Sequence, residues 1–207
     1  MMIRNVYCIG RNYGRHAAEL GNAVPEEPLV FMKPTHAVVP MEGQTIRLPA
    51  DAGVIHYEAE LVVRAGRDVV PGLPVEEWMD AFALGLDFTL RDVQEKLKAK
   101  GYPWLKAKGF LHSAPLSEWQ PFPGMEELNK TFFSLEINGE EKQRGQALDM
   151  IFPIRKIADY IAVHYGLRKG DIIFTGTPAG VGAVSDGDRL VLLWNSRPLG
   201  SITVRIG

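Results

Sequence analysis

The chain is poor in cysteine and has no long hydrophobic run. Cys8 is the one cysteine among 207 residues, which excludes an internal disulfide and any metal site built from several thiolates. No segment approaches the ~18 consecutive apolar residues that a membrane-spanning helix needs. The first residues also lack the apolar core and cleavage site of a signal peptide. These absences predict a cytoplasmic protein with no membrane partner.

An excess of positive charge is also missing. Lys and Arg number 23 against 25 Asp and Glu, for a net charge of −2, whereas a dedicated nucleic-acid binder carries a basic excess. The chain has no Walker A loop and no dinucleotide fingerprint. With 46% hydrophobic residues it has an ordinary globular composition. We therefore expect no nucleic-acid partner and one domain over residues 1–207.

The chain is predicted to consist mainly of short helices and strands separated by glycine and proline. Apolar runs and period-two alternation predict strands, and 3.6-residue periodicity with a start or stop signal predicts helices. The fold class expected is α+β, rich in β-structure. Strands are expected at 6–9, 29–32, 54–64, 83–88, 131–137, 171–176, 189–194 and 201–206, and helices at 14–20, 75–83, 90–100 (with Thr89 as N-cap) and 154–165.

Three carboxylates stand on two of these predicted strands. Glu58 and Glu60 are two residues apart, so they face the same way at roughly 6.5–7 Å. Asp87 ends a second apolar run, where a buried carboxylate without a partner is costly. A bare Glu-x-Glu is more often a solvated strand face, but three carboxylates together suit a hard cation such as Mg²⁺. The absence of cysteine pairs and of His-x-x-x-His argues against zinc.

Three other groups carry weaker signals. His16 and Glu19 share one face of a predicted helix, where a carboxylate can orient an imidazole as a general base, although most such pairs are surface pairs. Arg91 and Gln94 can point toward one end of the site, and Lys106 and Lys108 follow, although solvated helix charge is an alternative. The glycine-rich stretch 175–182 can bring backbone N–H groups close to an anion, or form a tight turn.

Taken together, these segments resemble the fumarylacetoacetate hydrolase family, in particular its small single-domain branch of acylpyruvate hydrolases and oxaloacetate decarboxylases. The matching segments occur in the family's order and span nearly the whole chain. They are residues 10–19 (GRNYGRHAAE), 31–34 (FMKP), 56–61 (HYEAEL), 86–94 (LDFTLRDVQ), 101–108 (GYPWLKAK) and 170–182 (GDIIFTGTPAGVG).

The resemblance implies a role for each matching position. It implies a β-rich roll with flanking helices, a homodimer, and residues 10–30 as a lid segment. The implied metal ligands for Mg²⁺ or Mn²⁺ are Glu58, Glu60 and Asp87. The implied catalytic residues are Lys108 beside the metal, in preference to Lys106, and His16 with Glu19 as the pair that activates water. The implied substrate-contacting residues are Arg11, Asn12, Arg91, Gln94 and Thr177.

The activity expected from these roles is metal-dependent hydrolysis of a C–C bond in a 3-acylpyruvate, an α-keto acid, to give pyruvate and a carboxylic acid. Decarboxylation of oxaloacetate, or isomerisation of a 2-hydroxy-diene or 2-oxo-ene diacid, could use the same metal site. A non-catalytic dicarboxylate binder is an alternative from a different class, disfavoured because a binder has no need of a water-activating pair.

Overall fold

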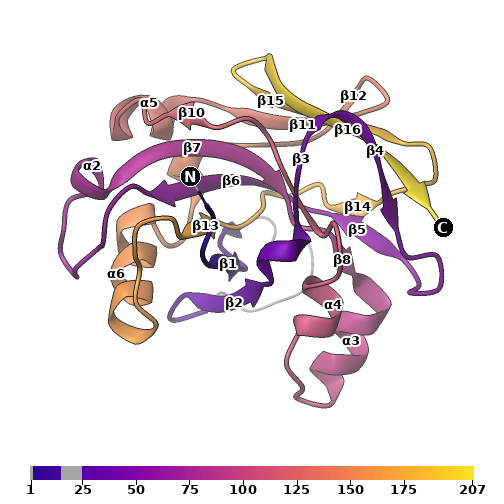
Figure 1. Cartoon of the computed structure of the whole chain (residues 1–207), viewed down its shortest axis with the longest axis horizontal. Coiled ribbons are helices and arrows are strands. Elements are labelled where there is room, and N and C mark those ends of the chain that lie inside the picture. The colour runs from indigo at the N-terminus through magenta and orange to yellow at the C-terminus, as the bar shows by residue number, and fades with distance from the viewer. Residues whose placement is uncertain (1, 15–24) are drawn as a thin grey trace.

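The computed structural model of the chain describes residues 2–14 and 25–207. Within these residues the chain is mostly β-structure with a few short helices (Figure 1). The helices are α2 (Val75–Trp78), α3 (Arg91–Ala99), α4 (Leu105–Lys108), α5 (Met125–Lys130) and α6 (Ile154–His164), with 3-10 turns η1 (Thr35–Ala37) and η2 (Ala147–Asp149). The β-rich α+β class predicted from the sequence is confirmed. None of the helices described is long and apolar enough to cross a bilayer.

The largest sheet joins segments from all along the chain. Its order in the described residues is β2-β1-β13-β6-β7-β9-β3, and β10 also pairs with β7. The strands are β1 (Val6–Gly10), β2 (Leu29–Lys33), β3 (Val38–Pro40), β6 (Ala59–Ala65), β7 (Met79–Leu86), β9 (Ala114–Leu116), β10 (Gln120–Pro121) and β13 (Ile172–Phe174). The sheet therefore brings residues near 10, 33, 60, 86 and 174 into one region.

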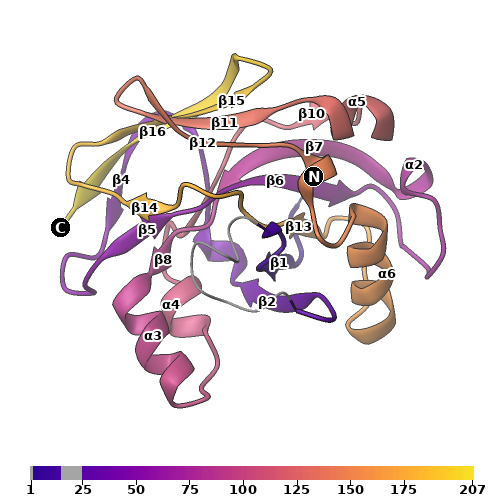
Figure 2. The ribbon, with the colours of Figure 1, turned by 180° about the vertical axis from the view of Figure 1, so that it is seen from behind.

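A second sheet packs against the first. Its order is β12-β11-β15-β16-β4, from β4 (Glu42–Leu48), β11 (Phe133–Ile137), β12 (Glu140–Gly145), β15 (Arg189–Trp194) and β16 (Arg197–Ile206). In Figures 1 and 2 it lies along one side of β6 and β7, while α6 and the α3–α4 pair lie at opposite ends of the other side. A short sheet, β14-β5-β8, joins β5 (Ile55–Tyr57), β8 (Thr89–Leu90) and β14 (Gly182–Ala183).

The main apolar core is built from alternate residues of the strands that face it. Within the segment predicted as a strand at 54–64, alternate residues belong to this cluster: Ile55, Tyr57, Ala59, Leu61 and Val63. The strand itself is not continuous, because β5 ends at Tyr57 and β6 begins at Ala59. Glu58 lies in this break, next to the third, short sheet.

Two local predictions are wrong. The helix expected at 75–83 ends at Trp78, and β7 runs through the rest. Side chains of β7 are buried on both faces, with Phe82 and Leu84 in the main core and Ala83 in a second apolar cluster, and the resulting apolar run hides the alternation of a strand. Thr89 does not cap α3, whose N-cap residue is Leu90, without a side-chain cap.

Candidate active site

Pairing between β6 and β7 brings the three carboxylates together. Glu60 is opposite Gly85 in the ladder, and the amide of Asp87 donates to the carbonyl of Glu58 at 2.8 Å. One oxygen from each of Glu58, Glu60 and Asp87 lies within 4.8 Å of the others. All three residues are buried, with exposures of 6%, 2% and 1%. The predicted carboxylate cluster is therefore present, and its oxygen donors suit a hard divalent cation.

Lys108 lies directly against this cluster. Its ammonium is 2.8 Å from Glu58 Oε2 and 2.6 Å from Asp87 Oδ2, and it donates to Thr89 Oγ1 at 2.7 Å. Burial alone would lower the pKa of Lys108, but the carboxylates of Asp87 and Glu58 outweigh it and raise that pKa above its ordinary value. Lys106, the less favoured candidate, is exposed on the same short helix.

Two further cationic side chains form ion pairs with these carboxylates. Lys33, whose side chain is fully buried, places its ammonium 2.7 Å from Asp87 Oδ1. The same ammonium donates to the carbonyls of Phe88, Ser113 and Lys108. Arg91 NH2 is 2.6 Å from Glu58 Oε1. Among the described residues, the formal charges of Lys33, Arg91 and Lys108 balance those of the three carboxylates.

Glu60 differs from its two neighbours. Its Oε2 accepts the amide of Gly176 at 2.7 Å, but among the described residues no cationic side chain contacts it. Burial, together with the nearby charges of Asp87 and Glu58, raises the pKa of Glu60 well above its ordinary value. A divalent cation between the three carboxylates would relieve this cost, so the residues present fit a Mg²⁺ or Mn²⁺ ion.

The start of α3 contributes the polar wall. Arg91 and Gln94 are one turn apart, and Arg91 NH1 donates to Gln94 Oε1 at 2.7 Å. Arg91 Nε also lies 3.3 Å from His56 Nδ1. Burial and the charge of Arg91 lower the pKa of His56, which favours the neutral imidazole that accepts this bond. Arg91 is therefore held on two sides, and its guanidinium spans Glu58 and Gln94.

The loop after β13 closes the site from the other side. Gly176 has φ of 102°, and a side chain there would clash with Asn12, since an added Cβ would lie 2.7 Å from the Cβ of that residue. Thr177 Oγ1 donates to the carbonyl of Ala59 at 2.8 Å and accepts from Gln143 at 2.9 Å. The expected anion-binding amide of this loop is thus used by the protein's own carboxylate, Glu60.

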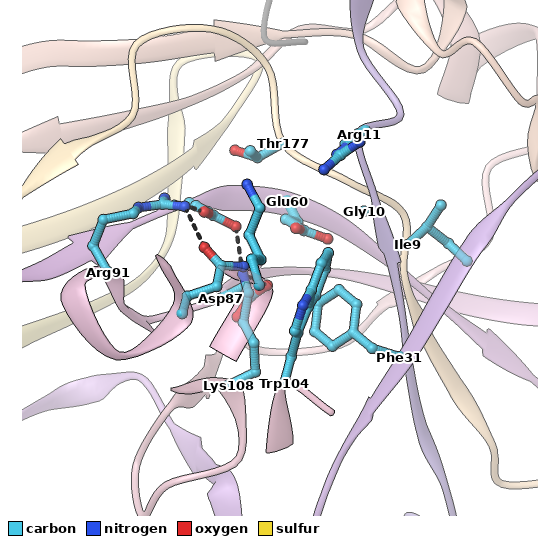
Figure 3. Close-up of a pocket in the computed structure, with 13 residues that line it drawn as sticks. Ile9, Gly10, Arg11, Phe31, Glu60, Asp87, Arg91, Trp104, Lys108 and Thr177 are labelled. Carbon is cyan, nitrogen blue, oxygen red and sulfur yellow. Dashed lines mark hydrogen bonds and ion pairs between the residues drawn. The ribbon is translucent and has the colours of Figure 1, made fainter. Parts of the chain in front are cut away.

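These elements enclose one polar pocket (Figure 3). Of the predicted site residues, the structure brings together at this pocket the carboxylates Glu58, Glu60 and Asp87 with Lys108, Arg11, Arg91, Gln94 and Thr177. Arg11 adopts φ of 57°, a left-handed conformation that is uncommon for a non-glycine residue. Further lining residues not predicted from the sequence are Ile9, Gly10, Phe31, Lys98 and Trp104.

Asn12 does not line this pocket. Its amide nitrogen donates to the carbonyls of Phe152 and Thr175, at 3.1 and 2.8 Å, and its side-chain oxygen accepts the amide of Phe152 at 2.7 Å. Asn12 therefore joins the end of β1 to two distant loops. The predicted pair His16 and Glu19, and residues 15–24 of the predicted lid segment 10–30, lie outside the described residues.

Comparison with known proteins agrees with this geometry. Residues 5–206 match the family described as fumarylacetoacetate (FAA) hydrolase C-terminal. The oxaloacetate tautomerase YcgM of Escherichia coli (strain K12) is 39% identical, over 99% of this chain and 93% of that protein. The human mitochondrial oxaloacetate tautomerase FAHD1 is 41% identical, over 90% of this chain and 85% of that protein.

A solved structure extends the similarity to three dimensions. Fumarylpyruvate hydrolase from Pseudomonas aeruginosa, in complex with Mn²⁺ and pyruvate, superposes with a TM-score of 0.91 at 36% identity, covering 99% of this chain and 91% of that one. The matched residues include every element that builds the pocket. The chain belongs to the fumarylacetoacetate hydrolase family.

Proposed function

We propose that this protein is a divalent-metal-dependent enzyme that interconverts the keto and enol forms of oxaloacetate or of a similarly short 2-oxo-dicarboxylate. The observation that carries the proposal is the excess of positive charge that the pocket would have with a divalent cation bound. Among the described residues, Lys33, Arg91 and Lys108 balance the three carboxylates, so the charge of the cation remains, together with that of Arg11 and Lys98. A dianionic substrate suits this excess better than a monoanion such as acetylpyruvate.

The metal would act as a Lewis acid on the carboxylate and keto oxygens of a 2-oxo acid, which acidifies the C–H bonds next to the keto group. The ammonium of Lys108, held 2.6 Å from Asp87, places a fixed positive charge where the enolate oxygen gains negative charge. In the keto-to-enol direction the C3–H bond breaks and its electron pair forms the C2–C3 double bond, while the electron pair of the C2–oxygen π bond moves to that oxygen, which gains a proton.

The distal carboxylate of the substrate has cationic partners on the pocket's outer wall. Arg11 and Lys98 line the pocket, and neither makes an ion pair among the residues described. Arg91 is already shared between Glu58 and Gln94, so we assign it to the inner part of the site. Binding at both ends fixes C2 and C3 relative to Lys108, the positioning on which much of enzymatic rate enhancement depends.

Hydrolysis of an acylpyruvate is a second candidate function. It is favoured by the similarity to the fumarylpyruvate hydrolase solved with Mn²⁺ and pyruvate, because pyruvate is the 2-oxo acid half of an acylpyruvate. This reaction also needs an activated water, the role expected of His16 with Glu19. Decarboxylation of oxaloacetate is a related possibility at the same site, since it yields the enolate of pyruvate without a water nucleophile.

Three assays separate these functions. Loss of the ultraviolet absorbance of enol-oxaloacetate reports tautomerisation, and pyruvate release from oxaloacetate or from fumarylpyruvate reports decarboxylation or hydrolysis. We expect tautomerisation to be the fastest of the three with Mn²⁺ or Mg²⁺, and to be lost in EDTA and in Asp87→Asn. An undiminished rate in EDTA would contradict the metal-dependent mechanism.

The His16→Ala variant divides the functions further. We expect it to abolish fumarylpyruvate hydrolysis while sparing oxaloacetate decarboxylation, because only hydrolysis needs an activated water. Equal loss of both reactions would contradict this division of roles.

A further inference from the structure

Two aromatic side chains stand between the polar pocket and a neighbouring apolar groove. Phe31 is on β2 and Trp104 immediately precedes α4; their ring centroids are 5.8 Å apart, with the planes tilted by 57°. Both residues line the polar pocket. Both also line a groove formed by Leu29–Met32 and Gly101–Leu105. Figure 3 shows the two rings side by side at the edge of the site.

This aromatic pair is close to the chemistry. The ammonium of Lys108 lies 5.1 Å from the centroid of the Phe31 ring. The carbonyl of Trp104 accepts the amides of Ala107 and Lys108, at 2.8 and 3.0 Å, so one turn of chain positions both the indole and the ammonium. A substrate bound beside Lys108 would therefore lie next to this aromatic pair.

The indole of Trp104 also lies against strand β1. A Cβ added to Gly10 would lie 3.7 Å from Trp104 Cζ3 and 3.2 Å from Leu29 Cδ2, so the backbone of β1 packs against the indole. Beyond the indole, the groove opens to solvent, where Tyr102 and Leu105 are each 56% exposed. Unlike the pocket, the groove has no charged side chain among the residues that line it.

We propose that Trp104 determines substrate length, by separating the charged pocket from the apolar groove. With the indole in place, a 2-oxo acid is confined to the charged pocket, which suits a short dicarboxylate. Removal of the indole joins the two spaces and admits an apolar chain into the groove. The inference rests on the proposed function, because it assumes that a 2-oxo acid binds beside Lys108.

The test is calorimetric binding of straight-chain 2-oxo acids, from pyruvate to 2-oxooctanoate, to the Mn²⁺-loaded protein. For the wild type we expect affinity to stay level or fall as the chain lengthens. For Trp104→Ala we expect 2-oxooctanoate to bind at least about tenfold more tightly than pyruvate, since each buried methylene can improve affinity about fourfold. Trp104→Phe keeps an aromatic ring and should follow the wild-type profile.

Tyr102→Ala is the matched control, because Tyr102 lines the groove but not the pocket. Alone it should leave the wild-type profile unchanged, and combined with Trp104→Ala it should reduce the gain for long chains. Trp104→Val also removes the indole and can replace Trp104→Ala in this test if that variant is unstable. Loss of pyruvate binding in both variants would show that Trp104 is needed for binding itself, contrary to the proposal.

Two other outcomes overturn the inference in different ways. If the wild type binds pyruvate and Trp104→Ala keeps the same chain-length profile, Trp104 does not determine length and the proposed function stands. If no 2-oxo acid binds the wild type with Mn²⁺, the proposed function itself fails, and this inference fails with it.

Discussion

At the scale of single residues, Glu60 has the environment most dependent on a metal. It is fully buried next to two other carboxylates, and a backbone amide is its one hydrogen-bond donor among the described residues. Because its pKa is raised, the carboxyl of Glu60 keeps its proton to a higher pH in the folded, metal-free protein than in the unfolded chain. Ionisation of Glu60 therefore opposes folding when no cation is bound.

The direction of this pKa shift predicts how the stability of the metal-free protein depends on pH. A raised carboxyl pKa stabilises the fold fully below the ordinary glutamate pKa, and the stabilisation is lost as pH rises through the folded-state value. We expect Glu60→Gln, which cannot ionise, to become increasingly more stable than wild type as pH rises from 4.5. Thermal melts in EDTA across this range measure the difference; a constant difference would contradict the assignment.

Glu60→Gln should stabilise the metal-free protein but weaken its binding of a metal ion. Loss of an outer hydrogen bond near a metal costs about 10–100-fold in affinity, so we expect the loss of a ligand in Glu60→Gln to cost more. Titration with Mn²⁺ measures this. Glu136→Gln, at a half-buried glutamate on β11, is a control that should bind Mn²⁺ as the wild type does.

Residue patterns predicted the carboxylate cluster but not all of its partners. The spacing of Glu58 and Glu60 and the apolar run before Asp87 were informative because they depend on local sequence. The partnership of Lys33 with Asp87 depends on β2 and the end of β7 meeting in three dimensions. Thr89 likewise gave a misleading signal: its position suggested a helix cap, while its hydroxyl in fact accepts from Lys108.

At the scale of elements, Gln143 on β12 holds three parts of the site together. Its side-chain oxygen accepts the amide of Ala59 at 2.8 Å. Its nitrogen donates to Thr177 Oγ1 and to the carbonyl of Pro178, both at 2.9 Å. The second sheet thus fixes the start of β6 and the loop that contacts Glu60.

We expect Gln143→Ala to destabilise the protein by about 2 kcal/mol, because it leaves buried backbone groups unsatisfied. For a chain of this length that corresponds to a fall in Tm of about 4–8 °C, and Mn²⁺ affinity should fall as well. Gln146→Ala is the matched control: Gln146 is partly exposed and makes one long bond, of 3.3 Å, to Asp149. Similar losses in both variants would contradict this role for Gln143.

Element prediction succeeded where local pattern and tertiary context agree. The helix expected at 154–165 forms as α6 (Ile154–His164), and the strand expected at 189–194 forms as β15. The region 75–86 failed because β7 is buried on both faces, so its composition does not alternate. The break between β5 and β6 at Glu58 also has no local signal, since the residues on either side of it alternate without interruption.

At the scale of the whole molecule, the pocket is assembled from segments distant in sequence. Residues 9–11 and 31 meet residues 58–60, 87–108 and 177 at one place. The sheet order that achieves this joins β1 to β13 and β13 to β6. Local periodicity identifies strands but not their partners, so this order could not be derived from the sequence pattern alone.

Because the three carboxylates lie on or next to the central strands β6 and β7, we expect metal binding to stabilise the whole chain as one unit. A ligand at 100 times its Kd adds about 2.7 kcal/mol, or roughly 5–10 °C in Tm at this size. Calorimetry with Mn²⁺ should show one transition that shifts as a whole. Two transitions, of which only one responds to Mn²⁺, would contradict the expectation of one domain over residues 1–207.

The homodimer stays a prediction of the family resemblance. Sedimentation velocity at micromolar concentration should give about twice the chain mass of 23.0 kDa. A species of the single-chain mass at these concentrations would contradict it.

The proposed function requires that the three carboxylates hold a divalent cation to which a 2-oxo acid binds. Oxalate resembles the enolate form of such an acid, so its affinity tests the claim directly. We expect calorimetry to detect oxalate binding with Mn²⁺ present and at least about a hundredfold weaker binding in EDTA, because oxalate would bind through the metal, which acts as a Lewis acid. Equal oxalate affinity with and without Mn²⁺ would contradict it.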